Sequence, residues 1–278
     1  MNYDIPVDQW ATAVVDFLLD HAQGFFDIIS AGLDMLTFGI EDVLLLPPAW
    51  LLITLLTLLA WWRTSWRFAL FSAAALALVV GMGLWSETVA TLALVIAATL
   101  VSLVIGIPLG IWAARNDLVE RIVRPVLDLM QTMPAFVYLI PAAMFFGLGR
   151  VPGVVATIIF AMPPAVRLTN LGIRQVPKEL VETGLAFGCT SGQLLLKVQL
   201  PTARPSIMAG VNQTIMLALS MVVIASMIGA GGLGDTVLRG IQRLDVGLGF
   251  EGGLGVVILA IILDRITQSF GKQRRNSG

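Results

Sequence analysis

Charged residues are scarce in this chain of 278 residues: 13% are Asp, Glu, Lys or Arg, while 57% are hydrophobic. A soluble globular protein carries about 25% charged residues. The mean hydropathy of +0.89 agrees with this shortage of charge. A soluble fold is therefore disfavoured, and the composition predicts an all-α protein that crosses a membrane several times.

Cysteine and histidine are nearly absent, with one of each, Cys189 and His21. A single thiol cannot close a disulfide within the chain, and it has no second thiol at the spacing of metal ligands. A zinc site or a Ser-His-Asp set would have to form around His21 in an acidic stretch. We therefore expect no catalytic and no metal site, with Cys189 reduced and His21 on the surface.

Basic residues are few, and the first 50 residues contain none of them but eight acids. That stretch has a formal charge of −8 and the rest of the chain +7. Apart from the tail Lys272, Arg274 and Arg275, the basic residues are scattered singly, which argues against binding to nucleic acid. A cleavable signal peptide needs a basic segment before its apolar core, so we expect the N-terminus to be retained.

Seven apolar stretches approach the length of about 20 residues with which a helix crosses the hydrocarbon core. They lie at 46–62, 68–85, 89–113, 129–148, 151–168, 207–228 and 252–270. The fifth is short and contains Pro163-Pro164, and the seventh carries either Asp264-Arg265 or Glu251. The predicted organisation is an N-terminal segment at 1–45, two peripheral spans in 46–85, a core of five spans in 86–270 and a basic tail at 271–278.

The distribution of Lys and Arg predicts the orientation, because these residues favour the cytoplasmic side. With seven spans and an outside N-terminus, 14 of the 17 basic residues lie inside. The outer side keeps Arg150, Arg239 and Arg243. The pattern therefore predicts an outside N-terminus and an inside C-terminus.

The acidic N-terminal stretch has a helical period, because Asp20, Asp27, Asp34 and Glu41 recur every seven residues among apolar neighbours. One interpretation is an amphipathic helix on the outer membrane surface, broken at Gly24 and Gly32. The other is a flexible tail that contacts a partner. The apolar content favours the helix.

The longest inside loop, 177–206, is too polar to span and is regularly patterned. Pro177 and Glu179 suit a helix start, and Gly188 allows a turn before a second apolar helix, which Pro201 ends. A helix, a turn and a second helix at the membrane surface would suit docking of a cytoplasmic partner. The alternative is a simple connector.

This loop resembles the signature loop of the membrane subunits of ATP-binding-cassette importers, whose pattern is Glu-Ala-Ala, three residues, Gly, nine residues, Ile, one residue, Leu-Pro. The chain has Glu182-Thr183-Gly184, then Gly188, Val198 and Leu200-Pro201 at the same spacing. Thr183 and Gly184 replace the alanines, and Val198 replaces the isoleucine. Gly184 lowers helix propensity by about 1 kcal/mol relative to Ala.

The resemblance is more specific over residues 88–268, which are similar to the glycine betaine/proline betaine permeases; QTMPAFVYLIPAAMFFGLG at 131–149 and AGVNQTIMLALSMVVIASMIGAGGLG at 209–234 carry it. It implies the type I importer permease fold in a bacterial inner membrane, a pore made with a second copy, a cytoplasmic ATPase pair and an external binding protein. The chain has no G-x-x-x-x-G-K-[ST] phosphate loop, so ATP and magnesium are expected on the ATPase, with no cofactor on this chain.

The resemblance also implies roles in the loop. Gly188 would form the turn, and residues 189–196, beginning at Cys189, would form the coupling helix with Leu194 and Leu195 as apolar contacts to the ATPase. Glu182 would bind backbone N–H groups at a helix start or pair with a basic residue, or it is a solvated acid.

For the pore, Gln213, Met216, Ser220 and Met227 share one helical face, and Asn212 lies beside it. Polar residues within a span face a cavity or join helices, and both interpretations stay open. Tyr138 could offer an aromatic face to a quaternary ammonium, although packing is the commoner role.

Outside, Asp235, Arg239 and Arg243 follow a glycine-rich hinge and would contact the binding protein, or they form a surface loop with one local ion pair. An ion-coupled secondary transporter is the competing class, and a membrane scaffold is a third. A secondary transporter is expected to show ionisable residues inside its spans and internal repeats; no convincing repeat is present, and charges lie mainly at span ends.

Overall fold

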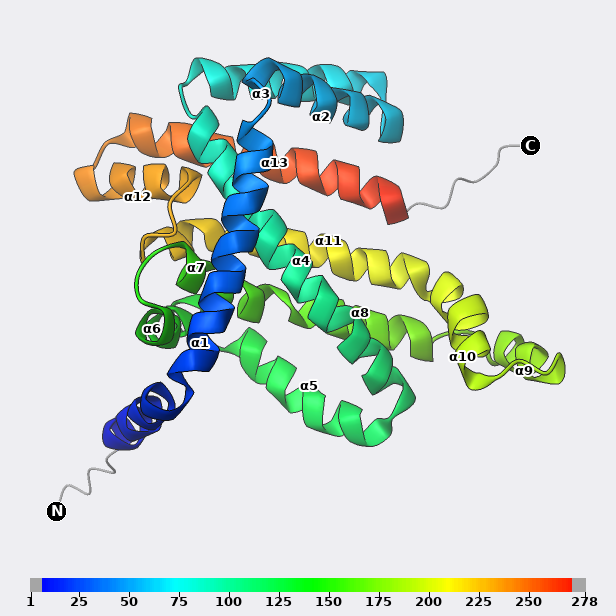
Figure 1. Ribbon diagram of the computed structural model, residues 1–278. Helices are drawn as coiled ribbons and strands as arrows, with labels where there is room; N and C mark the ends of the chain where they lie inside the picture. The colour runs from blue at the N-terminus through cyan, green and yellow to red at the C-terminus, as the bar shows by residue number, and fades with distance from the viewer. Residues whose placement is uncertain (1–6, 272–278) are drawn as a thin grey trace.

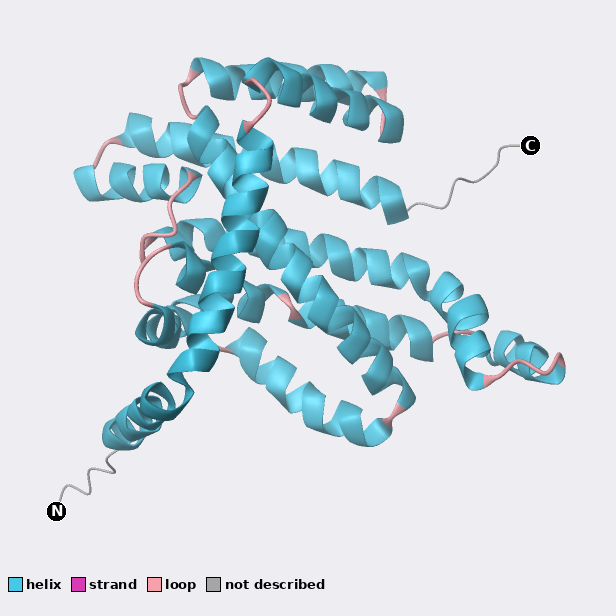
Figure 2. Ribbon diagram, in the orientation of Figure 1, coloured by secondary structure: helices cyan, strands magenta, loops and turns pink. Residues whose placement is uncertain are grey.

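The computed structural model describes residues 7–271, and the basic tail predicted at 271–278 lies outside the described residues apart from its first backbone position. Helices and short connections make up the described part, which contains no strand (Figures 1 and 2). The predicted all-α class is thus confirmed. The elements are α1 Val7–Leu45, α2 Ala49–Arg63, α3 Trp66–Gly81, α4 Trp85–Arg115, α5 Asp117–Thr132, α6 Ala135–Phe146, α7 Arg150–Ala161, α8 Pro163–Arg174, α9 Lys178–Ala186, α10 Ser191–Leu194, a π-helical turn Leu195–Gln199, α11 Leu200–Ser226, α12 Leu233–Arg243 and α13 Val246–Gly271.

Four helical stretches among the described residues are long and apolar enough to cross a membrane: Trp85–Arg115, Arg150–Arg174, Ser191–Ser226 and Val246–Phe270. They contain the predicted spans at 89–113, 151–168 and 252–270, and all but the last two residues of the one at 207–228. Two sharply bent helix pairs, α1 with α2 and α5 with α6, raise the number to six if each pair is one span. The predicted number of seven is higher because α3 is a shorter apolar helix of 16 residues.

The span predicted at 129–148 is wrong as a straight helix, because α5 and α6 meet at an angle of 102°. Pro134 disfavours helical backbone at the residue before it, and Met133 is extended there, with φ −72° and ψ 136°. By contrast, Pro163 and Pro164 fall in the first turn of α8, where proline costs no hydrogen bond. The stretch of α7 and α8 therefore continues to Arg174.

Glycines let the central helices approach closely. A Cβ atom on Gly110 of α4 would lie 2.6 Å from the backbone oxygen of Val166 in α8, and one on Gly172 of α8 would lie 2.7 Å from Ser206 Cβ of α11. Small residues at such crossings permit backbone packing inside a bilayer. The buried core beside these crossings is aliphatic and includes Val154, Leu219 and Ile262.

The N-terminal segment is a continuous helix over its described residues, so the interpretation as a flexible tail and the break at Gly24 and Gly32 are wrong. Figure 1 shows α1 running across α4, α6 and α7. Leu33 enters the core, and Phe26 stacks on Phe145 of α6 with ring centroids 4.6 Å apart. Its place on the outer membrane surface, and the division of the chain at residues 45 and 85, remain predictions.

We expect Gly110→Ala to destabilise the α4–α8 packing by about 1–3 kcal/mol, because the new methyl group overlaps backbone and must push the helices apart. Thermal unfolding of the purified chain in detergent measures this. Gly24→Ala in α1 is the control, since nothing lies within 4 Å of its Cβ position. An unchanged unfolding temperature for Gly110→Ala would show that the helices are not in contact there.

Candidate functional site

The loop between α8 and α11 folds as the spacing of its residues predicts, with helix α9, a turn, and helix α10 projecting from one end of the molecule (Figure 1). Gly188 has a left-handed φ of 77°. The N–H groups of Gly188 and Cys189 donate to Leu185 O at 2.9 Å and Gly184 O at 3.0 Å, which is the Schellman termination of a helix. Thr190 and Gln193 then form a capping box that starts α10.

The inner side of the loop is closed by apolar contacts. Gly184 is buried, and a Cβ atom there would lie 2.7 Å from Leu194 Cδ1, so the missing side chain makes room for Leu194. Leu195 packs with Ile173 and Ala203. Leu194 and Leu195 are each only 9% exposed, so the prediction that they point outward to a partner is wrong.

Other apolar side chains form the outer surface of the loop. Phe187 is 85% exposed at the tip, and Leu185 and Leu196 are also exposed. Glu182 is exposed in the middle of α9 and forms no ion pair among the described residues, so neither predicted partner is seen. The Thr183 hydroxyl donates to Glu179 O, one turn earlier in α9, at 2.6 Å.

Val198 and Leu200 are half-buried where the loop enters α11. Pro201 does not end the second helix, contrary to the prediction. A π-helical turn precedes it, in which the N–H of Leu200 donates to Leu195 O, and Pro201 lies in the first turn of α11. The wider π-helical turn lets the helix continue through Pro201, since π-bulges change the hydrogen-bond register of a helix. Residues 191–226 therefore form one long helical stretch.

Helix α5 carries a charged face that sequence reasoning missed, because residues 114–128 were assigned to an inside loop. Asp117, Glu120, Arg124 and Asp128 recur at helical spacing, and that spacing was the available signal. Arg167 of α8 pairs with Asp128 at 2.6 Å. Between α5 and α8 lies a cavity of about 340 Å³, lined by Glu120, Arg124, Asp128, Arg167, Asn170 and Arg174 together with apolar residues.

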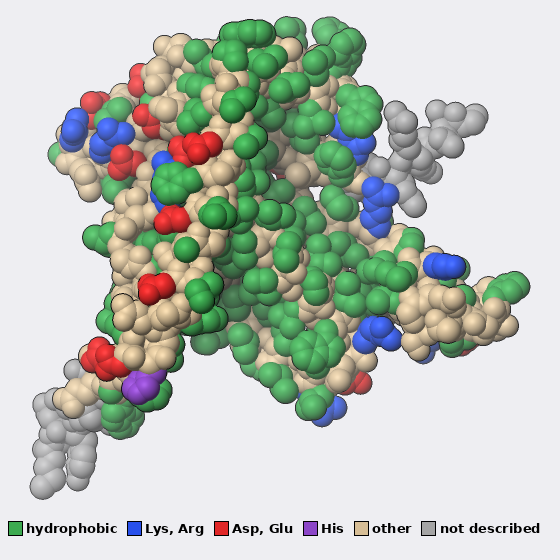
Figure 3. Space-filling model, viewed as in Figure 1, with side chains coloured by type: hydrophobic (Ala, Val, Ile, Leu, Met, Phe, Trp, Pro, Cys, Tyr) green, Lys and Arg blue, Asp and Glu red, His purple; other side chains and the backbone are tan. Residues whose placement is uncertain are grey.

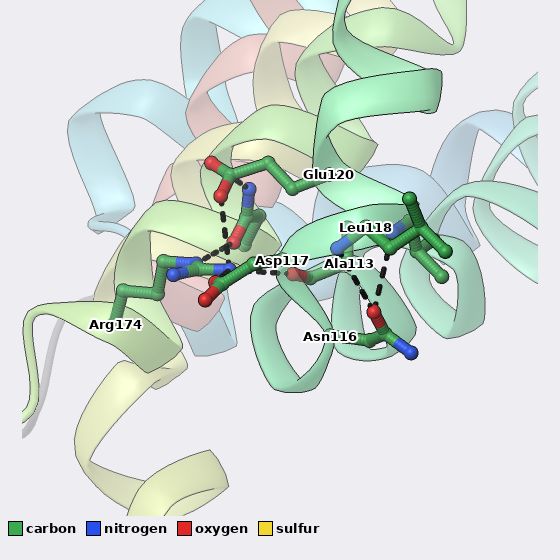
Figure 4. Close-up of polar contacts among 8 residues, drawn as sticks. Ala113, Asn116, Asp117, Leu118, Glu120 and Arg174 are labelled. Atoms are coloured by element: carbon green, nitrogen blue, oxygen red, sulfur yellow. Dashed lines mark hydrogen bonds and ion pairs between the residues drawn. The ribbon is translucent and has the colours of Figure 1, made fainter.

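At the end of this cavity nearest the loop, Arg174 joins three helices (Figure 4). Its Nη2 atom lies 2.7 Å from Asp117 Oδ1 and 2.9 Å from Glu120 Oε2, and donates to Ala113 O at 2.9 Å. Its Nε atom donates to Asn170 Oδ1 at 2.9 Å, and Asn170 in turn donates to Glu120 Oε1 at 3.2 Å.

The predicted pore residues separate into two groups. Gln213, Ser220 and Met227 are exposed and Met216 is half-buried on one side of α11. Asn212 instead donates to Asp264 Oδ1 of α13 at 2.9 Å and accepts from Thr267 at 2.8 Å, so it joins two helices. Tyr138 is buried and donates to Met130 O at 2.8 Å, which closes the α5–α6 bend.

The predicted outer segment is helix α12, at the opposite end of the molecule from α9 (Figure 1). Gly232 has φ 73°, and the next N–H, that of Leu233, donates to Thr91 Oγ1 of α4 at 2.8 Å. Asp235 and Arg239 form the predicted pair at 3.1 Å, and Arg243 is exposed. Basic side chains gather around α12 and at the opposite end, with hydrophobic ones between them (Figure 3).

Comparison with known families identifies the class of the protein. Residues 106–276 match the family described as "Binding-protein-dependent transport system inner membrane component". The match covers more than half of the chain, and the chain belongs to this family. It is a multi-pass membrane permease subunit of an ABC importer, as the resemblance of its loop implied.

Similar proteins specify the branch of the family. The chain is 53% identical to the "Glycine betaine/proline betaine transport system permease protein ProW" of Escherichia coli, across 99% of this chain and 77% of that protein. It is 52% identical to the "Glycine betaine/carnitine transport permease protein GbuB" of Listeria monocytogenes, across 98% of both. A chain of the inward-facing MetNI methionine ABC transporter shares the fold, with a TM-score of 0.60 and 23% identity over 69% of this chain and 96% of that chain. The type I permease fold is thus confirmed.

We expect Gly188→Ala to loosen the α9–α10 turn, because an L-residue in left-handed backbone costs about 1–2 kcal/mol. Hydrogen–deuterium exchange of residues 178–194 measures this as faster exchange. Gly192→Ala in α10 is the matched control, because nothing lies within 4 Å of its Cβ position. Equal exchange in the two variants would contradict the role of the turn.

Proposed function

We propose that this chain forms, with a second copy of itself, the transmembrane pore through which a separate ATPase drives import of a quaternary-ammonium compatible solute such as glycine betaine or proline betaine. The observation that carries the proposal is the projecting loop of α9 and α10, which has the spacing of the importer signature around Gly188 and exposes Phe187 at its tip. We take the solute class from the two relatives, which are glycine betaine/proline betaine and glycine betaine/carnitine transport permeases by name.

The ATPase binds at the outer surface of this loop. Phe187, Leu185 and Leu196 are apolar and exposed, and burying a large side chain of this kind in a partner contributes about 1.5–3 kcal/mol. The ATPase binds ATP and magnesium, and this chain contributes no catalytic group and no cofactor ligand. Its task is to convert movement of the loop into movement of the spanning helices.

The ends of the molecule face opposite sides of the membrane. The loop of α9 and α10 lies in the cytoplasm, with the C-terminus inside and the N-terminus outside, as the distribution of Lys and Arg predicts. Helix α12 then faces outward, where Asp235, Arg239 and Arg243 contact the binding protein that delivers the solute. Both surfaces lie at the ends of the hydrophobic region (Figure 3).

The exposed side of α11 faces the second copy and the pore. Gln213, Met216, Ser220 and Met227 form this side, and two polar side chains on a spanning helix are costly against lipid. Asn212 and Tyr138 do not line this face, because their polar atoms already bind partners in α13 and α5. The pore holds its solute weakly, because tight capture is the task of the binding protein.

We expect Phe187→Ser to reduce recovery of the ATPase with the tagged chain, because the substitution removes the largest exposed apolar side chain of the loop. Quantitative mass spectrometry of the gently purified complex measures the ratio. Leu244→Ser is the control, as Leu244 is 89% exposed in the turn after α12. Full recovery with Phe187→Ser would place the ATPase elsewhere.

The solute class is tested by stimulation of ATP hydrolysis in the complete complex with its binding protein. We expect stimulation by glycine betaine or another methylated amine, since such a cation is recognised by aromatic faces at about 0.5–2 kcal/mol for each contact. Methionine is the comparison solute. Stimulation by methionine alone would contradict the proposed solute class and leave the importer class standing.

A further inference from the structure

Arg174 lies at the junction between α8 and the loop of α9 and α10. It is the last residue of α8, and α9 begins at Lys178, so it lies immediately before the loop assigned to the ATPase. A displacement of that loop acts first on this end of α8. The contacts of Arg174 therefore determine which other helices follow the loop.

Those contacts lead to the end of α4 and the start of α5. Ala113 belongs to the last turn of α4, and Asp117 and Glu120 belong to the first turn of α5. Figure 4 shows the guanidinium between these groups. Asn170 accepts from Arg174 and donates to Glu120. A guanidinium offers several donors in a fixed plane, so it can hold all of these acceptors in one geometry.

Helix α5 has few contacts with other helices and lines the charged cavity. Its outward side is apolar and exposed, with Leu118, Ile122, Val126 and Leu129. Its charged side faces α8 across the cavity of about 340 Å³. A helix with charges on its inner side and apolar residues outside indicates that the cavity, and not the surroundings, is polar. Movement of α5 against α8 changes the width of this cavity.

We propose that Arg174 is a positioning residue that makes α5 move with the ATPase-driven loop, so that each ATP cycle changes the cavity between α5 and α8. The inference rests on the proposed function, because it takes the loop of α9 and α10 as the place where the ATPase acts. Asp117 and Glu120 receive the movement, and Asn170 holds Glu120 and Arg174 in register.

The pair of Arg167 and Asp128 offers a matched control. It also joins α8 to α5 by a guanidinium and a carboxylate, at 2.6 Å. It lies in the middle of α8 and contacts neither the loop nor the end of α4. Loss of this pair removes an ionic contact of the same kind without removing the connection at the base of the loop.

The test compares Arg174→Gln, Arg174→Lys and Arg167→Gln in proteoliposomes that contain the complete complex, with radiolabelled glycine betaine as the solute. We expect Arg174→Gln to lower the uptake per ATP hydrolysed about five- to thirtyfold, the size of typical coupling between sites. Arg174→Lys should be intermediate, because an ammonium lacks the planar fork. Arg167→Gln should stay within about twofold, because its pair with Asp128 lies in the middle of α8 and does not join the base of the loop to α4 and α5.

A merely structural role would lower uptake and hydrolysis in equal proportion, and that outcome would overturn the proposal. Uptake and hydrolysis in Arg174→Gln that both stay at the level of the unmodified complex would overturn it as well. Failure of the unmodified complex to take up glycine betaine contradicts the proposed function instead, so the two failures are distinguishable.

A second measurement needs neither solute nor ATPase. Spin labels at exposed Leu185 of α9 and exposed Ile122 of α5, with Cys189→Ser, report the distance between loop and helix. We expect a narrow distance distribution when Arg174 is present and a broad one in Arg174→Gln. Equal widths in the two proteins would overturn the proposal irrespective of the transported solute.

Discussion

A polar group inside a bilayer must find a partner within the protein or in enclosed water, and this constraint accounts for much of the structure. Several buried threonines return their hydroxyls to the preceding turn, as Thr88 does to Leu84 O and Thr157 to Gly153 O. Asn212, Asp264 and Thr267 satisfy one another between α11 and α13. Acids on the charged side of α5 likewise pair with Arg167 and Arg174 of α8.

Close packing of α4, α8 and α11 holds these groups in register. Glycines at the crossings bring the helices into backbone contact, so a shift of one helix is felt by its neighbours. Helix α8 emerges from this packed region at Arg174 and leads directly into the loop that carries the importer signature. The same helix therefore belongs to the rigid centre and to the surface at which the proposed ATPase acts. Helix α5, which ion pairs of Arg167 and Arg174 join to α8, is the element that the proposal expects to follow the loop.

Much of this structure could be predicted from local patterns. Apolar length placed four spanning helices, the position of Gly188 gave the turn of the loop, and the spacing of Asp235 and Arg239 gave their ion pair. These features depend on residues close together in the sequence. The motif spacing also indicated the family, because the signature residues lie within one loop.

The remaining features depend on which helices meet, and local patterns do not determine that. Leu194 turns inward because Gly184 of another helix leaves it space, and Asn212 is occupied because Asp264 lies opposite. The continuous apolar stretch at 129–148 predicted one straight span, although the chain bends at Pro134. Helix α5 was missed because its charges suggested a loop, whereas their partners are on α8.

The central claim is that this chain is the pore of an ATP-driven importer and not a carrier driven by an ion gradient. Asp264, an ionisable residue within α13, is the feature that a secondary carrier would use. The most direct measurement is uptake of labelled glycine betaine into proteoliposomes that contain the purified complex, with its binding protein outside and ATP inside. The account predicts uptake only when ATP and the binding protein are both present, with no response to collapse of the ion gradients. Uptake by this chain alone, driven by a proton or sodium gradient without ATP, would contradict it.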